Sequence, residues 1–456
     1  MDMLSVDALP GLVPGVAAMS LADDAAGLID QLRELERLKS ACAAAQARAT
    51  VAFKRLQVAE HEAAGVPCVR RGKDVAAQVA LARRESPRNG SRLVGMADAL
   101  VREMPRTMAA LAAGELNEWR ATLMVRETAC LTREHRQLLD AELAGRLGEL
   151  SDRALVAEAR KVAYRLDPYS FVERARKVEA DRCVSLRPAP DCMTRLSALL
   201  PVVDGVAAFA ALTQAADAAR AAGDERGRGQ VMADTLVERV TGRSGGTVEV
   251  EIQLIMSDQT LFGGMGGSMG DGDGDTANEA ALIVGHGPVP APFARQMVRD
   301  LPSDARTWIR RLYADPDSGR LISMESTARL FPVGLRRFLV ARDQLCRTPW
   351  CGAPIRHADH VVPHHLGGAT SANNGQGLCE ACNQIKTMPG WRARPGPEGA
   401  GDTVTTVTPT GHPYQSRPSG PPGVRHRRRW PAVDFYPPPP GGSPLEQRLS
   451  RIFAAA

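Results

Sequence analysis

Two closely spaced pairs of cysteines constrain the C-terminal part of the chain more than any other feature. Cys346 and Cys351 have four residues between them, and Cys379 and Cys382 have two, after a gap of 27 residues. Two thiol pairs with such short internal gaps suit a tetrahedral zinc ion, because each pair supplies one edge of the tetrahedron. Two disulfides are the alternative, but nothing marks a secreted chain. The spacing therefore predicts a structural zinc site.

The loop that this zinc would close carries polar residues suited to a second metal ion. Asp359 and His360 lie between the cysteine pairs, and Asn383 directly follows the last cysteine. Carboxylate and amide oxygens suit a hard divalent cation, Mg²⁺ or Mn²⁺. A histidine beside them can act as a general base toward water. The pattern indicates hydrolysis of a phosphodiester, in which such an ion neutralises developing charge.

The local sequence predicts the elements that carry these residues. Alternation around 359–362 favours a short strand, the Gly-Gly that follows favours a β-hairpin, and 380–386 is typical of one or two helical turns. Such a small unit has little core of its own. The zinc is therefore expected to supply the stability that burial cannot.

The arrangement resembles the HNH endonucleases, in their zinc-stapled ββα-metal form. His360 matches the first, catalytic His of that family's motif, and Asp359 before it matches a frequent metal ligand. Asn374 matches the middle Asn, and Asn383 occupies the place of the last His, nine residues later. Asn at that place departs from the name HNH, although it is a common variant, and its amide oxygen can still bind a hard cation.

The resemblance implies a mechanism for cutting DNA. His360 takes a proton from the attacking water, Asp359 and Asn383 hold the catalytic Mg²⁺ or Mn²⁺, and Asn374 orients the loop that carries His360. By analogy with the family, the products have 5′-phosphate and 3′-hydroxyl ends. The structural zinc ligands are expected to be Cys346, Cys351, Cys379 and Cys382.

Other interpretations of these residues stay open. A zinc-stapled DNA-binding or regulatory protein that does not cut is the main alternative, and RNA as the substrate is a third. Asn374 could simply cap a turn. His357, His364 and His365 fit surface positions better than ligand positions, and His364 is the best of them for a phosphate contact.

A helix expected over 331–344 leads into the zinc site and carries three arginines. Arg336, Arg337 and Arg342 are candidates for contact with the phosphates of double-stranded DNA. Exposed arginines are usually only solvated, which is the alternative for each of them.

The longest part of the chain, 21–242, is expected to be a mainly α-helical domain. Leu28, Leu32 and Leu35 show the three- and four-residue spacing of a helix face. The region resembles the helical domain of unknown function that precedes HNH modules in an actinobacterial family, the 13E12-repeat proteins. The matching stretches are PRTMAALAAGEL, a DP followed by an Arg-rich helix to DR, and DERGRGQVMAD.

Composition completes the predicted organisation. A net charge of +5 permits a nucleic-acid partner. No apolar run approaches the roughly 20 residues needed to span a bilayer, and no signal peptide is evident, so a cytoplasmic protein without a membrane partner or small-molecule cofactor is expected. An oligomer formed through the N-terminal helices stays open. The other expected segments are a flexible leader (1–20), a small α+β connector (246–330) with a Gly/Asp-rich loop (263–275), the HNH module (331–395) and a Pro/Gly/Arg-rich tail (396–456). Within that tail, 402–408 could add an edge strand, and the later part is expected to be disordered.

Overall fold

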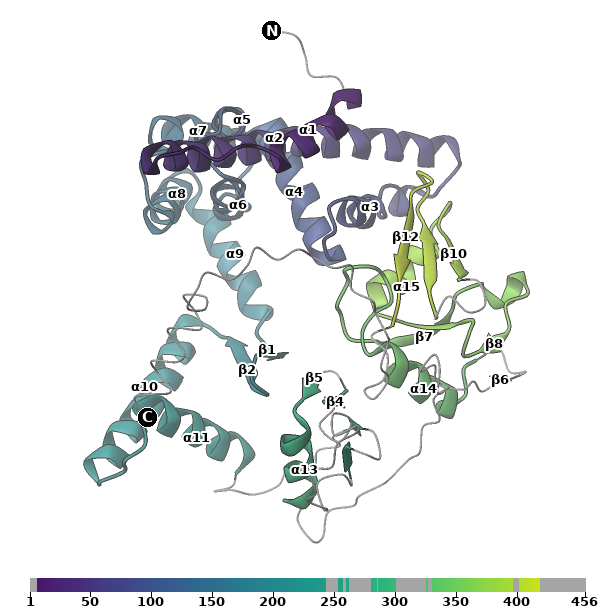
Figure 1. The fold of residues 1–456 in the computed structure, drawn as a ribbon. Coiled ribbons are helices and arrows are strands. Elements are labelled where there is room, and N and C mark those ends of the chain that lie inside the picture. The colour runs from purple at the N-terminus through teal and green to yellow at the C-terminus, as the bar shows by residue number, and fades with distance from the viewer. Residues whose placement is uncertain are drawn as a thin grey trace.

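The computed structural model describes residues 6–242, 253–256, 260–261, 280–284, 286–300, 325–326, 330–396 and 402–418. Figure 1 shows helices in the N-terminal part and a module of small strands and short helices near the C-terminus, with a few short elements between them. This order confirms the predicted fold class. The Gly/Asp-rich loop and the tail beyond 418 lie outside the described residues.

The N-terminal helices begin at the caps that the sequence provides. Side chains of Asp24, Ser86, Asn117, Thr132 and Ser151 each accept a hydrogen bond from a backbone N–H of the first helical turn. The helices are α1 (Leu9–Ala17), α2 (Ala25–Ala63), α3 (Val75–Ala82), α4 (Pro87–Glu103), α5 (Pro105–Ala113), α6 (Glu118–Glu127), α7 (Arg133–Leu143) and α8 (Asp152–Leu166). Helix α1 lies in the segment expected to be a flexible leader, and none of its residues is buried.

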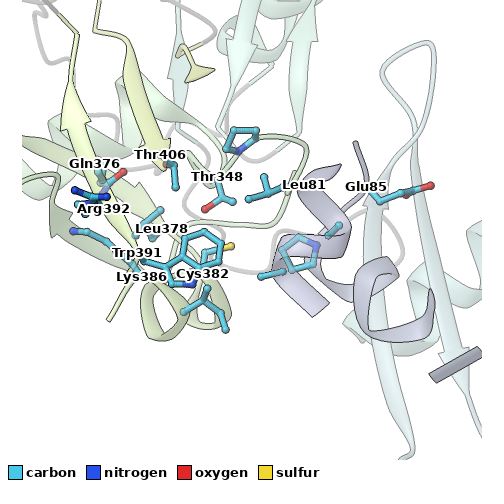
Figure 2. Close-up of a pocket in the computed structure, with 16 residues that line it drawn as sticks. Leu81, Glu85, Thr348, Gln376, Leu378, Cys382, Lys386, Trp391, Arg392 and Thr406 are labelled. Atoms are coloured by element: carbon cyan, nitrogen blue, oxygen red, sulfur yellow. The ribbon is translucent and has the colours of Figure 1, made fainter. Parts of the chain in front are cut away.

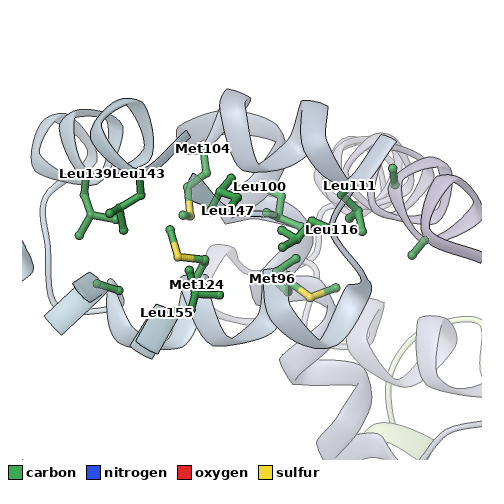
Figure 3. Packing of buried hydrophobic residues seen from close by; sticks show 14 of the residues in the cluster. Met96, Leu100, Met104, Leu111, Leu116, Met124, Leu139, Leu143, Leu147 and Leu155 are labelled. Atoms are coloured by element: carbon green, nitrogen blue, oxygen red, sulfur yellow. The ribbon is translucent and has the colours of Figure 1, made fainter. Parts of the chain in front are cut away.

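One hydrophobic core joins α2 through α8. It is built mainly from Leu, Met, Val and Ala, and Leu100, Met104 and Leu155 are fully buried within it. Figure 3 shows these side chains converging from several helices. Burial of apolar side chains is the main stabilising contribution here, so this part of the chain has a core independent of the C-terminal module.

The elements after α8 share little of that core. They are α9 (Pro168–Ala180), β1 (Cys183–Pro188), β2 (Thr194–Leu199), α10 (Val202–Ala221) and α11 (Arg228–Thr241). Strands β1 and β2 form an exposed antiparallel hairpin, and α10 buries only Ala216. Among the described helices, α10 alone is long and apolar enough to cross a membrane, judged by length and composition only. The core of the predicted 21–242 domain therefore ends near α8.

The connector contributes a small sheet and one helix to the described residues. The elements are β3 (Leu254–Ile255), β4 (Ala281–Ile283), β5 (Gly287–Val289), α13 (Ala291–Arg299) and β6 (Glu325–Ser326). Strand β4 lies between β3 and β5, and β6 pairs with β8 (Thr370–Ser371) of the C-terminal module. The predicted α+β character agrees with these elements.

The C-terminal module contains the predicted strands and helix, and it extends further than expected. Its other elements are α14 (Val333–Asp343), β7 (His357–His360), β9 (Gly375–Leu378), α15 (Glu380–Lys386), β10 (Arg392–Pro395), β11 (Val404–Val407) and β12 (Pro413–Ser416). Strand β11 is the middle strand of a three-stranded antiparallel sheet. The tail predicted to begin at 396 therefore starts too early, because β11 and β12 belong to the folded module.

A buried charged cluster explains why β11 and β12 belong to the module. Arg347 donates to the carbonyl oxygens of Asp402 and Ser416, while its guanidinium lies 3.5 Å from Asp343. Burial lowers the pKa of Arg347 to about 10. Arg347 is only 3 % exposed, and a buried guanidinium needs such acceptors. The segment after residue 396 supplies them.

The helical domain contacts the C-terminal module through α3 and the turn before it. Trp391 donates its indole N–H to Asp74 (3.2 Å), and the Thr410 hydroxyl donates to Gln78 (3.1 Å). The Arg70 guanidinium lies 3.4 Å from the Thr387 carbonyl oxygen. Figure 2 shows the cavity at this contact, lined by Leu81 on one side and by Trp391, Lys386 and Cys382 on the other. The two parts thus share an interface.

The Trp391–Asp74 hydrogen bond is expected to stabilise this interface measurably. Asp74 is fully buried, so Trp391→Phe keeps most of the packing and removes one donor to a buried carboxylate. We expect a loss of about 1–3 kcal/mol in the free energy of unfolding, measured by urea denaturation. Trp350→Phe is the matched control, because Trp350 is 46 % exposed. Equal stability of both variants and the wild type would contradict the interface.

Candidate metal centre and nuclease site

Four cysteine sulfurs from two segments converge on one point. The ligand atoms of Cys346, Cys351, Cys379 and Cys382 all lie within 4.8 Å of one another. The Sγ of Cys351 is 3.7 Å from the sulfurs of both Cys379 and Cys382. A tetrahedron with zinc–sulfur bonds of about 2.3 Å has edges of about 3.8 Å. The donor set and spacing therefore fit a structural zinc ion, and all four thiols are free of disulfides.

Hydrogen bonds among the four sulfurs shift their acidity in opposite directions. The contact with Cys351 lowers the pKa of Cys346 to about 7, and the contact with Cys346 lowers that of Cys379. The same contacts raise the pKa of Cys351 and of Cys382. The four thiols therefore titrate as one coupled group, and thiolate is the form that binds metal.

The cysteine cluster lies at the start of one of the elements that carry the polar residues. Cys379 is the N-cap of α15, and its sulfur accepts from the backbone N–H of Cys382. Strand β7 pairs antiparallel with β9, placing Asp359 opposite Gln376 and His360 opposite Gly375. Strands β7 and β9 and helix α15 form the predicted ββα unit. Both Asp359 and His360 are half-buried on it.

Asn374 fastens both ends of the loop that follows β7. Its side-chain oxygen accepts from the Val362 N–H (2.8 Å), and its amide group donates to the carbonyl oxygens of Val362 (3.0 Å) and Ala369 (2.8 Å). A Cβ at Gly368 would lie 1.9 Å from the Val362 oxygen, so only glycine fits there. These bonds hold the backbone immediately after His360.

The His360 ring is held by neighbours on three elements. Its Nε2 is hydrogen-bonded to the Thr370 hydroxyl at 2.9 Å. Its ring centroid lies 4.5 Å from that of Phe331 and 5.7 Å from that of His364. Residue 364 is exposed. The imidazole of His360 therefore packs against Phe331 on one side and lies beside an exposed residue on the other.

Lys386 is the residue of this site that the sequence did not single out. Its ammonium group makes an ion pair with Asp359 and donates to the carbonyl oxygen of His360. Asn383 precedes Lys386 by three residues on α15, so both lie on the same helix face. A lysine one turn after a candidate ligand, facing a strand with a carboxylate, is the signal that could have revealed it.

The structure separates the three candidate phosphate-binding arginines. Arg342 is 4 % exposed, and its guanidinium bonds to Asp343 and to the carbonyl oxygens of Ala372 and Gly375. Its predicted contact with phosphate is therefore wrong, because the side chain is buried and its donors are engaged within the module. Arg336 and Arg337 are exposed on α14.

Two family models match consecutive parts of the chain. A family model described as a domain of unknown function, DUF222, matches residues 36–343. The chain belongs to the DUF222 family. A second model, described as HNH endonuclease, matches residues 346–388. That match covers the cysteine cluster, β7, β9 and α15, and it confirms the expected order of a helical domain of unknown function followed by an HNH domain.

Part of the chain is similar to a mycobacterial protein. The chain is 32% identical, over 142 residues, to uncharacterized protein Rv3776 of Mycobacterium tuberculosis. This match covers 30% of the chain and 25% of the relative, so it spans only a quarter of that protein's length. No solved structure matches the chain. The HNH module therefore supports a nuclease-type or zinc-binding role on the strength of the family match and the cysteine cluster.

The cysteine cluster predicts the metal content of the purified protein. We expect about one zinc per chain, lost in Cys379→Ser because the tetrahedron then lacks one thiolate. Cys42→Ser is the control, since Cys42 is exposed and outside the cluster. Elemental analysis by mass spectrometry gives the ratio. Equal zinc in Cys379→Ser and wild type would contradict the site.

The three side-chain hydrogen bonds of Asn374, here called the Asn374 clamp, are expected to protect the loop after His360 from hydrogen exchange. Asn374→Ala removes three side-chain hydrogen bonds, at roughly 1 kcal/mol each, so the loop after His360 should open more often. Hydrogen exchange should be faster at the amide of Val362 than in the wild type. Unchanged exchange there would show that Asn374 does not hold the loop. The Asn383→Ala variant, altered on α15, serves as the control.

Proposed function

We propose that the protein is a metal-dependent HNH endonuclease that hydrolyses phosphodiester bonds of double-stranded DNA. The observation that carries the proposal is the convergence of Asp359, His360 and the Asn374 clamp on the ββα unit that the four cysteines brace. The family match to HNH endonuclease over the same residues supports it. The family match and this arrangement fall on the same stretch of the chain.

His360 is the general base in this proposal. The hydrogen bond to Thr370 and the packing on Phe331 set the direction of the imidazole before substrate arrives, and orientation of a base is a large part of its effect. Asn374 contributes by fixing the backbone that carries His360. Asn374 is thus a positioning residue in the folded module.

A divalent cation at this site would bind oxygen ligands. The Asp359 carboxylate and the Asn383 amide are hard donors of the kind that Mg²⁺ and Mn²⁺ prefer, and both stand on elements that meet in the ββα unit. When bound, such an ion supplies charge stabilisation at the scissile phosphate and its leaving oxygen.

Three exposed side chains support a nucleic-acid surface beside the site. Arg336 and Arg337 lie on α14, and His364 lies in the loop next to His360. Cationic side chains around a nuclease site position the phosphate backbone and carry no sequence information. We propose Arg336, Arg337 and His364 as phosphate contacts. Arg342, the fourth candidate from the sequence, is left out because it is buried.

Cleavage of supercoiled plasmid with Mg²⁺ or Mn²⁺ tests the proposed base. His360→Ala should lower the rate by about 10²–10⁴-fold, the range for loss of a general base, with zinc content unchanged. His357→Ala is the matched control, because it lies three residues earlier on the same strand and so on its opposite face. Equal nicking by His360→Ala and wild type would exclude His360 as the base.

The non-cleaving alternative gives a different result in the same assay. A zinc-stapled DNA-binding or regulatory protein would leave plasmid intact with either metal. It would still shift duplex DNA on a gel in a salt-dependent way, because phosphate contacts release counterions. A parallel assay with single- and double-stranded RNA decides the substrate class.

A further inference from the structure

Lys386 makes contacts that are unusual for a surface lysine. Its ammonium group is bonded to the Asp359 carboxylate and to the carbonyl oxygen of His360, and its side chain is only 15% exposed. Asp359 is likewise only 27% exposed. Exposed ion pairs contribute little to stability, but this pair lies inside the candidate site and bonds two oxygen atoms at once.

Those two oxygens are of the kind that a hard cation binds. A carboxylate oxygen and a backbone carbonyl oxygen are typical ligands of Mg²⁺, Mn²⁺ and Ca²⁺. Asn383, the other proposed ligand, lies on the same face of α15 one turn before Lys386. The ammonium group therefore occupies Oδ2 of the carboxylate that the divalent ion would need. It does so from the same helix face that would supply the ion's second ligand.

An ammonium group and a divalent ion cannot bind the same carboxylate oxygen together. Both are positive, and their repulsion at such short separation is strong even at the effective dielectric constant of a protein surface. The long unbranched stem of lysine lets its head group move several ångströms without any change in the backbone. Lys386 can therefore withdraw from Asp359 while α15 stays in place.

We propose that Lys386 acts as a built-in stand-in for the divalent cation: it holds Asp359 when no ion is bound and must withdraw when one binds. This inference rests on the proposed function, because it takes Asp359 as a ligand of the divalent ion. Lys386 is then a positioning residue. It keeps the Asp359 carboxylate paired in the ion-free protein and lowers the affinity of the site for divalent ions.

Manganese binding to the full-length, zinc-loaded chain tests the proposal without any measurement of cleavage. Affinity is measured by isothermal titration calorimetry and by electron paramagnetic resonance of free Mn²⁺. Lys386→Met should bind Mn²⁺ about tenfold more tightly than the wild type, because the ion no longer displaces a charge-assisted bond. Lys386→Arg keeps the charge and should stay close to the wild type.

A double-mutant cycle links the effect to the carboxylate. In an Asp359→Asn background, the tenfold difference between Lys386→Met and Lys386 should disappear. Without added Mn²⁺, Lys386→Met should melt at a lower temperature than the wild type, and Mn²⁺ should raise its melting temperature by more. Lys386→Gln serves as a second neutral variant if Lys386→Met loses its zinc.

The outcomes separate this proposal from the proposed function. If Asp359→Asn weakens Mn²⁺ binding but Lys386→Met and Lys386→Gln leave the affinity unchanged or lower it, the stand-in role is overturned and the metal site remains. If Asp359→Asn leaves the affinity unchanged, Asp359 is not a ligand, and both the stand-in role and the proposed metal site fail.

Discussion

The convergence of four sulfurs is the constraint on which the C-terminal module depends. Cys346 and Cys351 lie in the loop after α14, and Cys379 and Cys382 form the first turn of α15. A single ion bound there ties a loop to the start of the helix that carries Asn383 and Lys386. Because this ββα unit has little apolar core, an ion bound by the four thiolates would supply stability that hydrophobic burial cannot.

Two further interactions extend that brace to the rest of the chain. Arg347 is buried and draws the backbone of β11 and β12 onto the module through the carbonyl oxygens of Asp402 and Ser416. Trp391, directly after the turn that ends α15, donates to the buried carboxylate of Asp74 in the helical domain. Helix α15 thus begins at the cysteine cluster, and the turn after its other end contacts the DUF222 domain through Trp391 and Asp74.

Local patterns in the sequence were enough to predict the ββα unit and the convergence of the four cysteines. Ligand spacing within the cysteine pairs and the alternation before Val362 are short-range features, and they specify α15 and β7 directly. The order of a helical domain followed by an HNH module was predicted as well. Helices α4 and α7 begin at Ser86 and Thr132, whose side chains cap their first turns.

The misses share a physical origin in long-range contacts. Arg342 looked like a surface arginine, since nothing near it in sequence shows that Ala372 and Gly375 accept its hydrogen bonds. Only an edge strand over 402–408 was expected after 396, because the local sequence does not show that Arg347, more than fifty residues earlier, bonds to the backbone of this segment. Lys386 went unnoticed because its partner, Asp359, lies 27 residues away.

A crystal of the zinc-loaded protein soaked in Mn²⁺ tests the central claim most directly, through anomalous scattering measured at the manganese and zinc edges. The account predicts a zinc peak among the sulfurs of Cys346, Cys351, Cys379 and Cys382, and a separate manganese peak within about 2.3 Å of oxygen atoms of Asp359 and Asn383. A zinc peak at the sulfurs with no manganese beside Asp359 would contradict the nuclease site and leave only a zinc-braced scaffold.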